Sequence, residues 1–273
     1  MDDFTRTAHQ ASKIVTENFS TSFSSASKLF SKDIRQDIYN IYGLVRIADE
    51  IVDTYQGPGT KAMLDDLEAE VYAAEQRGFS SNLIVHSFVL TTRKYNLDQS
   101  LVKAFFESMR MDISRKSYDE KMYKTYIYGS AEVIGLMCLS VFTKGDKKNY
   151  KRLQDGATAL GAAFQKVNFL RDIKDDYETR ERYYFPIGSF KNFNEADKDM
   201  IIKDIENDFD KANSYIDLLP SNSQRACRLA YTYYQELLKK LKQTPAHQIA
   251  NQRIRVGTLT KLLFLTKVKL QIL

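Results

Sequence analysis

Two acidic clusters carry most of the chemistry that this sequence could perform. Asp49 and Asp53 are four residues apart, and so are Asp172 and Asp176. On a helix, this spacing places the two carboxylates of a pair on one face, about 6 Å apart along the axis. Because like charges at that spacing repel and destabilise a helix, two such pairs among apolar residues predict that a cation lies between them.

Magnesium suits these side chains, since it prefers oxygen ligands and is usually held by one or two carboxylates together with substrate phosphates. Asn168 precedes Asp172 by one turn and joins its face, and Gln165 lies near the same stripe. Arg46 and Arg171 flank the clusters, and a guanidinium matches phosphate oxygens with a planar fork of donors. The pattern predicts a Mg²⁺–diphosphate site, with Mn²⁺ as an alternative ion. A solvated helix face with ion pairs is the competing interpretation of either cluster alone.

The elements that position these clusters are expected to be helices. Between 33 and 55 the apolar residues recur at helical spacing, and Gly57-Pro58-Gly59 ends that helix. The second cluster lies on a long helix expected over 147–178. Only 4 Pro and 11 Gly occur in 273 residues, which favours an all-α fold with one domain over 1–273. Further helices are expected over 5–30 (interrupted at Ser20–Ser25), 60–76, 81–94, 98–115, 119–142, 195–218, 222–242 and 254–271.

Composition excludes several classes of function. Hydrophobic residues make up 43% of the chain, which is enough for a sizeable core, and the net charge of +5 is mild. No nucleic-acid motif is present, so we expect no nucleic-acid partner. Neither a signal peptide nor an apolar run of about 18 residues is visible. Cys138 and Cys227 lack metal-ligand spacing, so we expect buried free thiols in a cytoplasmic protein.

The C-terminal segment 256–273 combines leucines with lysines. A basic amphipathic helix of this kind can lie on an anionic membrane surface. It is therefore compatible with peripheral association at the inner face of the cytoplasmic membrane. Packing of the segment against the rest of the domain is the alternative.

At the acidic clusters the sequence resembles the squalene/phytoene synthase family, the head-to-head prenyl transferases, and the resemblance covers nearly the whole chain. The segment 46–53 is similar to the family's first aspartate-rich motif, and 160–176 is similar to the second. Three further segments resemble family motifs: Ser22-Phe23, 126–137 and Arg182-Tyr183-Tyr184-Phe185-Pro186.

The resemblance implies a single-domain, all-α isoprenoid-synthase helical bundle around a central cavity. It also implies roles for individual residues. The implied metal ligands are Asp49, Asp53, Asn168, Asp172 and Asp176. The implied substrate-binding residues are Ser22, Phe23, Arg46, Gln165, Asn168, Arg171, Arg253 and Lys261, and Tyr128, Gln165 and Tyr184 would line the cavity near the reacting carbons.

Two positions depart from the family pattern. Glu132 stands where a small residue is expected, and it either adds a carboxylate to the cavity or is satisfied elsewhere. Lys174 replaces the usual glycine of the second motif, and we expect it to face away from Asp172 and Asp176.

The implied reaction is the Mg²⁺-dependent 1′–1 condensation of two identical prenyl diphosphates through a cyclopropylcarbinyl diphosphate, with release of diphosphate and without NADPH. The favoured activity is that of a phytoene synthase using two geranylgeranyl diphosphates, with other carotenoid-pathway enzymes as candidate partners. The alternative within the family is a dehydrosqualene or squalene synthase using two farnesyl diphosphates. A non-catalytic relative, and a head-to-tail prenyl transferase or terpene cyclase, are the competing classes.

Overall fold

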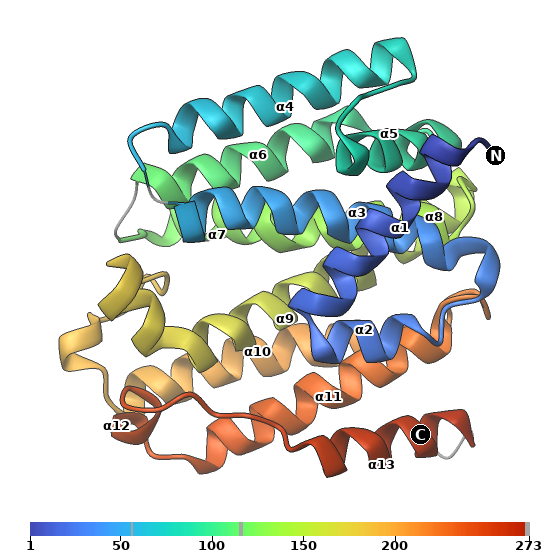
Figure 1. The fold of residues 1–273 in the computed structure, drawn as a ribbon. Helices are drawn as coiled ribbons and strands as arrows, with labels where there is room; N and C mark the ends of the chain where they lie inside the picture. The colour runs from blue at the N-terminus through green and yellow to red at the C-terminus, as the bar shows by residue number, and fades with distance from the viewer. Residues whose placement is uncertain (56, 115–116, 271–273) are drawn as a thin grey trace.

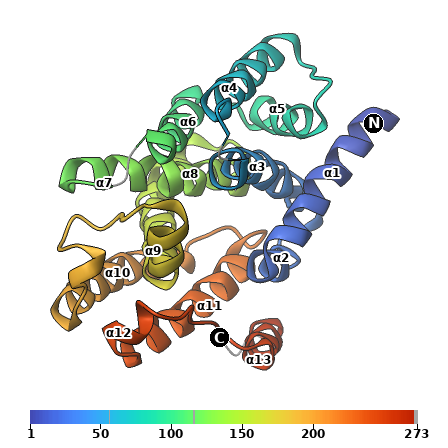
Figure 2. The same ribbon diagram turned by 60° about the vertical axis from the view of Figure 1, so that its left-hand side comes forward.

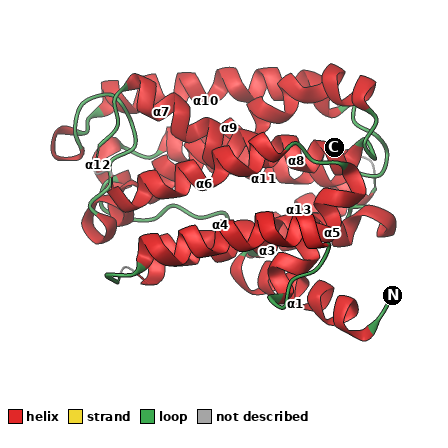
Figure 3. Ribbon diagram, turned by 90° about the horizontal axis from the view of Figure 1, so that it is seen from above, coloured by secondary structure: helices red, strands yellow, loops and turns green. Residues whose placement is uncertain are grey.

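The computed structural model describes residues 1–55, 57–114 and 117–270. These residues form helices and turns, with one isolated bridge between Ser117 and Tyr183 and no strand, so the all-α prediction is confirmed (Figure 3). The α-helices are α1 (Asp3–Phe19), α2 (Thr21–Ser27), α3 (Lys32–Glu50), α4 (Thr60–Arg77), α5 (Leu83–Tyr95), α6 (Gln99–Ser114), α7 (Glu120–Ile127), α8 (Val133–Phe142), α9 (Lys147–Arg180), α10 (Glu195–Ile216), α11 (Gln224–Gln243), α12 (Ala246–Ile249) and α13 (Thr258–Lys269). Three shorter helical turns are η1 (Ile51–Tyr55), η2 (Tyr128–Glu132) and η3 (Phe190–Asn192).

Local chemistry explains most helix ends. The break expected in the serine-rich stretch occurs at Ser20, whose extended backbone ends α1 and whose side chain accepts a hydrogen bond from the Phe23 amide at the start of α2. Asp146 caps α9 in the same way, and Asn194 forms a capping box with Asp197 at the start of α10. Side chains thereby satisfy amide groups that have no partner within the helix.

The last expected helix, 254–271, begins later than the sequence indicates. Residues 253–257 are not helical, and α13 starts only at Thr258, after Gly257 with an extended backbone. Arg253 in this stretch reaches back to the carboxylate of Asp172 on α9. A contact with a distant helix therefore overrides the helical pattern of the segment, and it brings the stretch before α13 to the centre of the molecule.

The helix α9 forms the middle of the structure. Figures 1 and 2 show α3, α4, α6 and α8 on one side of it and α10, α11 and α13 on the other. It packs against α8, α10, α11 and η2. Because α9 is 34 residues long, it spans the molecule at 1.5 Å per residue. Each half of the fold is therefore anchored to the helix that carries the second acidic cluster.

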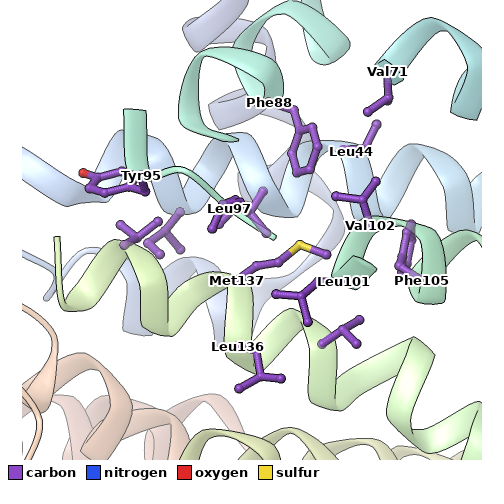
Figure 4. Close-up of a cluster of buried hydrophobic side chains, with 14 of the residues drawn as sticks. Leu44, Val71, Phe88, Tyr95, Leu97, Leu101, Val102, Phe105, Leu136 and Met137 are labelled. Atoms are coloured by element: carbon purple, nitrogen blue, oxygen red, sulfur yellow. The ribbon is translucent and has the colours of Figure 1, made fainter. Parts of the chain in front are cut away.

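Two large hydrophobic clusters support this arrangement. The first joins α3, α4, α5, α6 and α8, and Figure 4 shows Leu44, Phe88, Val102, Phe105 and Met137 converging within it, each at most 1% exposed. The second joins α7, α9, α10, α11 and the loop at 183–185. Each fully buried large side chain contributes about 1.5–3 kcal/mol to folding. The polar stripes of α3 and α9 lie between the two clusters.

One helical run in the described residues, Glu120–Phe142, is long and apolar enough to cross a membrane by length and composition alone. Two thirds of its most apolar window is buried inside the protein. It joins α7, η2 and α8 in the core. Burial of this kind is typical of a core helix, which passes the same composition test.

Glycines allow α9 to approach its neighbours closely. A Cβ at Gly161 would lie 2.5 Å from the Ala131 carbonyl oxygen, and a Cβ at Gly135 would lie 2.5 Å from the Ala157 carbonyl oxygen. Both contacts are with backbone, which cannot rotate aside as a flexible side chain does. The absence of a side chain at these two positions therefore sets the distance between α9 and the run from η2 to α8.

This close approach predicts that Gly161→Ala destabilises the protein. The methyl group should cost about 2 kcal/mol of unfolding free energy through overpacking, although alanine has the better helix propensity by about 1 kcal/mol. Gly257→Ala is the control, because no atom lies within 4 Å of a Cβ at that position. Urea denaturation of both variants measures the difference, and equal stability of the two would contradict the packing argument.

Candidate active site

A polar pocket of about 740 Å³ opens between α2, α3, α9, α11 and the stretch before α13. Of the residues predicted from the sequence to form the site, all except Tyr128 line this pocket. They are Ser22, Phe23, Arg46, Asp49, Asp53, Gln165, Asn168, Arg171, Asp172, Asp176, Tyr184, Arg253 and Lys261. The structure therefore brings together side chains from both ends of the chain, whereas their chemical roles stay predictions.

The first acidic stripe lies where α3 changes into a π-helical turn. Asp49 belongs to the last turn of α3, and Asp53 to η1. Arg46 donates a hydrogen bond to Asp49 at 2.5 Å and a second to Glu50, while its guanidinium lies 4.6 Å from the Phe19 ring centroid. Burial raises the pKa of Asp49 to about 7, and the negative charge of Asp53 adds to the effect.

The second stripe runs along α9. Asp172 accepts hydrogen bonds from Arg171 Nε at 2.9 Å and from Arg253 Nη2 at 3.3 Å, and Arg253 Nε lies 2.8 Å from its other carboxylate oxygen. Asp176 lies one turn later and pairs with Arg180 at 3.0 Å. Burial raises the pKa of Asp176 to about 7, with further contributions from the charges of Asp172 and Asp53. Since Asp53 belongs to the other stripe, the two stripes face each other.

Two arginines beyond the end of the second stripe tie it to the first. Arg180 Nε lies 3.2 Å from Asp53 Oδ2, and Arg182 donates to Asp53 Oδ1 at 2.6 Å. Arg182 also donates to the Val52 carbonyl oxygen at 3.1 Å and is 5% exposed. It was part of a family-like segment in the sequence, but it was not predicted as a site residue. Its buried position identifies it as the cross-link between η1 and the end of α9.

Asp112 on α6 is the carboxylate that the sequence prediction missed. It accepts hydrogen bonds from the hydroxyls of Tyr126 at 2.6 Å and Tyr184 at 2.9 Å, with Tyr118 at 3.3 Å. Burial raises its pKa to about 6. The sequence did hold a signal, because Asp112 continues the buried face of α6 at helical spacing.

The structure places Tyr128 outside this pocket, so the cavity position predicted for it is wrong. Tyr128 is 40% exposed, whereas Tyr126 is buried and lines the pocket. Residues two positions apart on a helix are separated by about 200°, so only one of the pair can face the cavity. Of the two tyrosines, the structure therefore places only Tyr126 in the pocket.

The two departures from the family pattern both point away from the central pocket. Glu132 lines a separate pocket with Lys166 and Asp204, and burial raises its pKa. It therefore adds no carboxylate to the central pocket, which removes one of the two sequence alternatives. Lys174 donates to the Asn251 carbonyl oxygen at 3.2 Å, which agrees with the expectation that it faces away from the acidic stripe.

The remaining predicted residues complete the polar walls. Phe23 stacks on Tyr42 with ring centroids 4.8 Å apart. The side-chain oxygen of Asn168 accepts a hydrogen bond from the Tyr234 hydroxyl at 3.3 Å. Burial, together with the nearby charge of Arg171, lowers the pKa of Lys261. A bound anion would stabilise the charged form of this lysine, because its negative charge would offset the burial and the repulsion from Arg171.

The donor set fits a hard divalent cation such as Mg²⁺. Four aspartates of the facing stripes line one pocket, and burial together with the charge of Asp53 raises the pKa values of two of them, Asp49 and Asp176. In the described ranges, however, no three His, Cys, Asp or Glu side chains form a group that could hold a metal ion. This arrangement suits an ion held by one or two carboxylates and completed by substrate phosphates and water.

A second, apolar cavity of about 260 Å³ continues from the polar pocket. The two share Phe23, Tyr42 and Gln165 in their walls. Along α9 the apolar lining extends from Gln165 to Ala157 and Gly156, and eight residues of helix correspond to about 12 Å. The cavity therefore forms a tunnel that leads from the charged stripes into the core.

Small side chains keep this tunnel open. Eight residues of its wall are alanine or glycine: Ala26, Ala131, Gly135, Gly156, Ala157, Gly161, Ala226 and Ala230. The two cysteines line it as free thiols, but of the predicted burial only Cys227 is fully buried, whereas Cys138 is half-buried. Burial raises the pKa of Cys138 to about 12. A wall of this composition accepts an apolar chain and offers almost no hydrogen-bonding partner.

The family model for squalene/phytoene synthases matches residues 16–260. The chain belongs to this family. Among curated squalene/phytoene synthase relatives, the 15-cis-phytoene synthase of Synechococcus elongatus is 30% identical over 208 residues, which cover 71% of this chain and 65% of that protein. The 4,4′-diapophytoene synthase of Staphylococcus haemolyticus is 22% identical over 250 residues and covers 84% of this chain and 85% of that protein. The matches to the first four curated relatives span 44% to 66% of their lengths.

Solved structures of the family share the fold. A dehydrosqualene synthase superposes with a TM-score of 0.84 at 19% identity, covering 98% of this chain and 97% of that chain. A squalene synthase of Alicyclobacillus acidocaldarius superposes with a TM-score of 0.77 at 20% identity, covering 92% and 98%. The predicted all-α isoprenoid-synthase fold is therefore confirmed. That residues 1–273 form a single domain stays a prediction.

The hydrogen bonds to Asp112 predict a structural cost when its carboxylate is removed. Asp112→Ala would leave the Tyr126 and Tyr184 hydroxyls without their acceptor and would remove one of the two carboxylates near Arg182, at 3.7 Å. We therefore expect a loss of about 3 kcal/mol in unfolding free energy. The control is Asp66→Ala on α4, where the side chain is exposed. Chemical denaturation measures both variants, and a loss below 1 kcal/mol for Asp112→Ala would refute the role of this carboxylate as a shared acceptor.

Proposed function

We propose that this member of the squalene/phytoene synthase family is a phytoene synthase. It would join two geranylgeranyl diphosphates 1′–1 through a cyclopropylcarbinyl diphosphate and release both diphosphates. The observation that carries the proposal is the pair of facing acidic stripes, flanked by arginines, at the mouth of an apolar tunnel. A prenyl diphosphate has a matching distribution of charge, because its diphosphate head group is anionic and its prenyl tail is apolar.

The polar pocket supports the ionisation of an allylic diphosphate. Arg46, Arg171, Arg253 and Lys261 line it together and would bind the oxygens of the departing diphosphate, as preorganised positive charges do at sites of developing negative charge. Mg²⁺, when bound, would stabilise that charge further. Its ligands would come from Asp49, Asp53, Asn168, Asp172 and Asp176.

Aromatic rings border the place where a carbocation would form. Phe169 and Tyr184 stack with ring centroids 4.0 Å apart, and both line the polar pocket. The faces of such rings attract cations, and a pocket from which water is excluded prevents premature capture of the cation. Gln165 stands at the junction of the pocket and the tunnel, where it would orient the reacting end of a tail.

The length of the tunnel bears on the choice between the twenty-carbon and the fifteen-carbon substrate. One isoprene unit adds about 5 Å to an extended chain, since single bonds advance roughly 1.2 Å each, and this equals about one helical turn. The alanines and glycines along α9 leave one such turn open beyond Gly161, as far as Ala157. A bulky side chain there would remove the space that the longer tail needs.

The second candidate is a synthase that uses two farnesyl diphosphates. It is favoured by the similarity to the 4,4′-diapophytoene synthase of Staphylococcus haemolyticus and to the fold of a solved dehydrosqualene synthase. Both candidates use the same polar pocket, so they differ only in tail length. We further propose a cytoplasmic location, supported by the free thiols, and other carotenoid-pathway enzymes as partners.

A product assay tests the proposed function. Purified protein with Mg²⁺, geranylgeranyl diphosphate and no NADPH should form phytoene, and EDTA should abolish turnover. Asp172→Asn should lower the rate at least 100-fold, as the loss of one preorganised electrostatic group typically does. Asp155→Asn is the control, because it is an exposed aspartate on the same helix. A thirty-carbon product from farnesyl diphosphate, with no product from the longer substrate, would reject the phytoene assignment.

A second experiment tests the tunnel. Ala157→Leu and Ala157→Phe should lower kcat/KM for geranylgeranyl diphosphate in that order, because each fills more of the turn beyond Gly161. The rate with farnesyl diphosphate should fall less, so the preference should shift toward the shorter substrate by about tenfold. Thermal melting curves control for stability, and an unchanged preference in Ala157→Phe would show that the tail lies elsewhere.

A further inference from the structure

The helix α13 has apolar residues on both of its faces. Its inner face packs Phe264, Leu265 and Val268 against α2 and α11. Its outer face presents Leu259, Leu262 and Leu263, and Leu270 follows directly after the helix on the same side; they are 79%, 58%, 62% and 64% exposed. In the part of the chain that the structure describes, nothing covers the outer leucines.

The spacing of the outer leucines makes them one continuous stripe. Leu259, Leu262, Leu263 and Leu270 follow one another at intervals of three, one and seven residues, which keeps them on the same side of a helix. The exposed large apolar residues elsewhere, such as Met63, Met200 and Leu218, lie on different elements. Scattered apolar residues are normal on a protein surface, whereas a contiguous apolar patch marks an interaction site.

The charge of the surrounding segment identifies what the stripe would bind. From Leu237 to the C-terminus the sequence has eight Lys and Arg and no Asp or Glu. The preceding 236 residues hold the other 32 basic residues and all 35 acidic ones. The whole positive excess of the protein therefore lies in its last segment. Lys267, on α13, is exposed like the leucines.

We propose that the outer face of α13, the stripe of Leu259, Leu262, Leu263 and Leu270 with Lys267, docks on the surface of an anionic lipid bilayer. The leucines would enter the boundary between head groups and acyl chains, and the basic segment would meet the negative head groups. This mode needs only one helix lying in the plane of the membrane. It is independent of which prenyl diphosphate the enzyme uses.

A second copy of the chain fits this face less well. In a two-fold dimer the same patch is present on both subunits, so the exposed Lys267 side chains of the two copies would come together and repel. An anionic bilayer instead offers the complementary charge. Docking there would also bring Arg253, Arg255 and Lys261, which line the polar pocket, close to the membrane surface.

Co-sedimentation with vesicles tests the proposal. The protein should bind vesicles of phosphatidylcholine mixed with phosphatidylglycerol. Its binding to vesicles of phosphatidylcholine alone should be at least tenfold weaker, and its binding to the mixed vesicles should weaken as salt increases. Replacing Leu259, Leu262 and Leu263 together by Ser should reduce binding at least tenfold. The matched control replaces Met63, Met200 and Leu218 by Ser, which removes three exposed apolar side chains from other elements.

A charge variant separates the electrostatic contribution. Lys267→Glu should weaken binding to the anionic vesicles at least fivefold, because each basic residue near such a surface contributes about that factor. Lys121→Glu, an exposed lysine on α7, should bind as the unmodified protein does. Thermal melting and circular dichroism verify that all variants are folded.

Two results would overturn the proposal. One is equal sedimentation of the triple leucine variant and the unmodified protein, or no binding of either to anionic vesicles. The other is a doubling of molecular mass in solution that the leucine variant abolishes, since the stripe would then be the contact between two copies. Neither result depends on turnover, so both can be distinguished from a failure of the proposed catalytic function.

Discussion

The site depends on the hydrogen-bonded ion pair between Arg182 and Asp53. Arg182 follows the long helix α9, and Asp53 lies on the π-helical turn after α3. The pair is therefore the point at which the two acidic stripes are held to each other across the pocket. Because Arg182 is 5% exposed, removing Asp53 would leave this buried charge with only the more distant carboxylate of Asp112, at 3.7 Å, which is destabilising. Arg180 reinforces the link at 3.2 Å, so the separation of the stripes is set by the protein before any ligand binds.

This link also explains how one pocket holds many charges of both signs. The aspartates of each stripe are paired with arginines, yet burial and mutual repulsion still raise the pKa values of Asp49 and Asp176 to about 7. Both carboxyls therefore hold a proton more readily than an exposed aspartate does. A divalent cation would compete with the arginines for the carboxylates. The arginines that it displaced could then bind the oxygens of a diphosphate. Binding of the cation and of the anion would therefore favour each other.

Much of the fold and of the polar site could be predicted from the sequence, because both follow from local rules. Helical periodicity and the Gly57-Pro58-Gly59 stop define α3, and the spacing of Asp172 and Asp176 places them on one face of α9. The failures concern contacts between distant elements. Asp112 lines the pocket because α6 packs beside the tyrosines, and this packing is not visible in the sequence. Tyr128 was predicted in the cavity where the structure has Tyr126, because the resemblance carries no information on which residue of the motif faces inward. The late start of α13 likewise follows from the contact of Arg253 with Asp172.

The same contact connects the catalytic pocket with the C-terminal helix. Arg253 is held by Asp172 on α9, and the Tyr233 hydroxyl donates to the Lys261 carbonyl oxygen at 3.0 Å. The stretch between these two anchors forms one wall of the polar pocket, and α13 follows directly. If a cation displaced Arg253 from Asp172, this wall would lose one of its anchors while α13 kept its own packing against α11. The hydrogen bond from Lys240 to the Arg255 carbonyl oxygen, at 3.2 Å, would still hold the stretch. The ion pair of Arg253 is thus the one anchor of this wall that a cation at Asp172 would compete with directly.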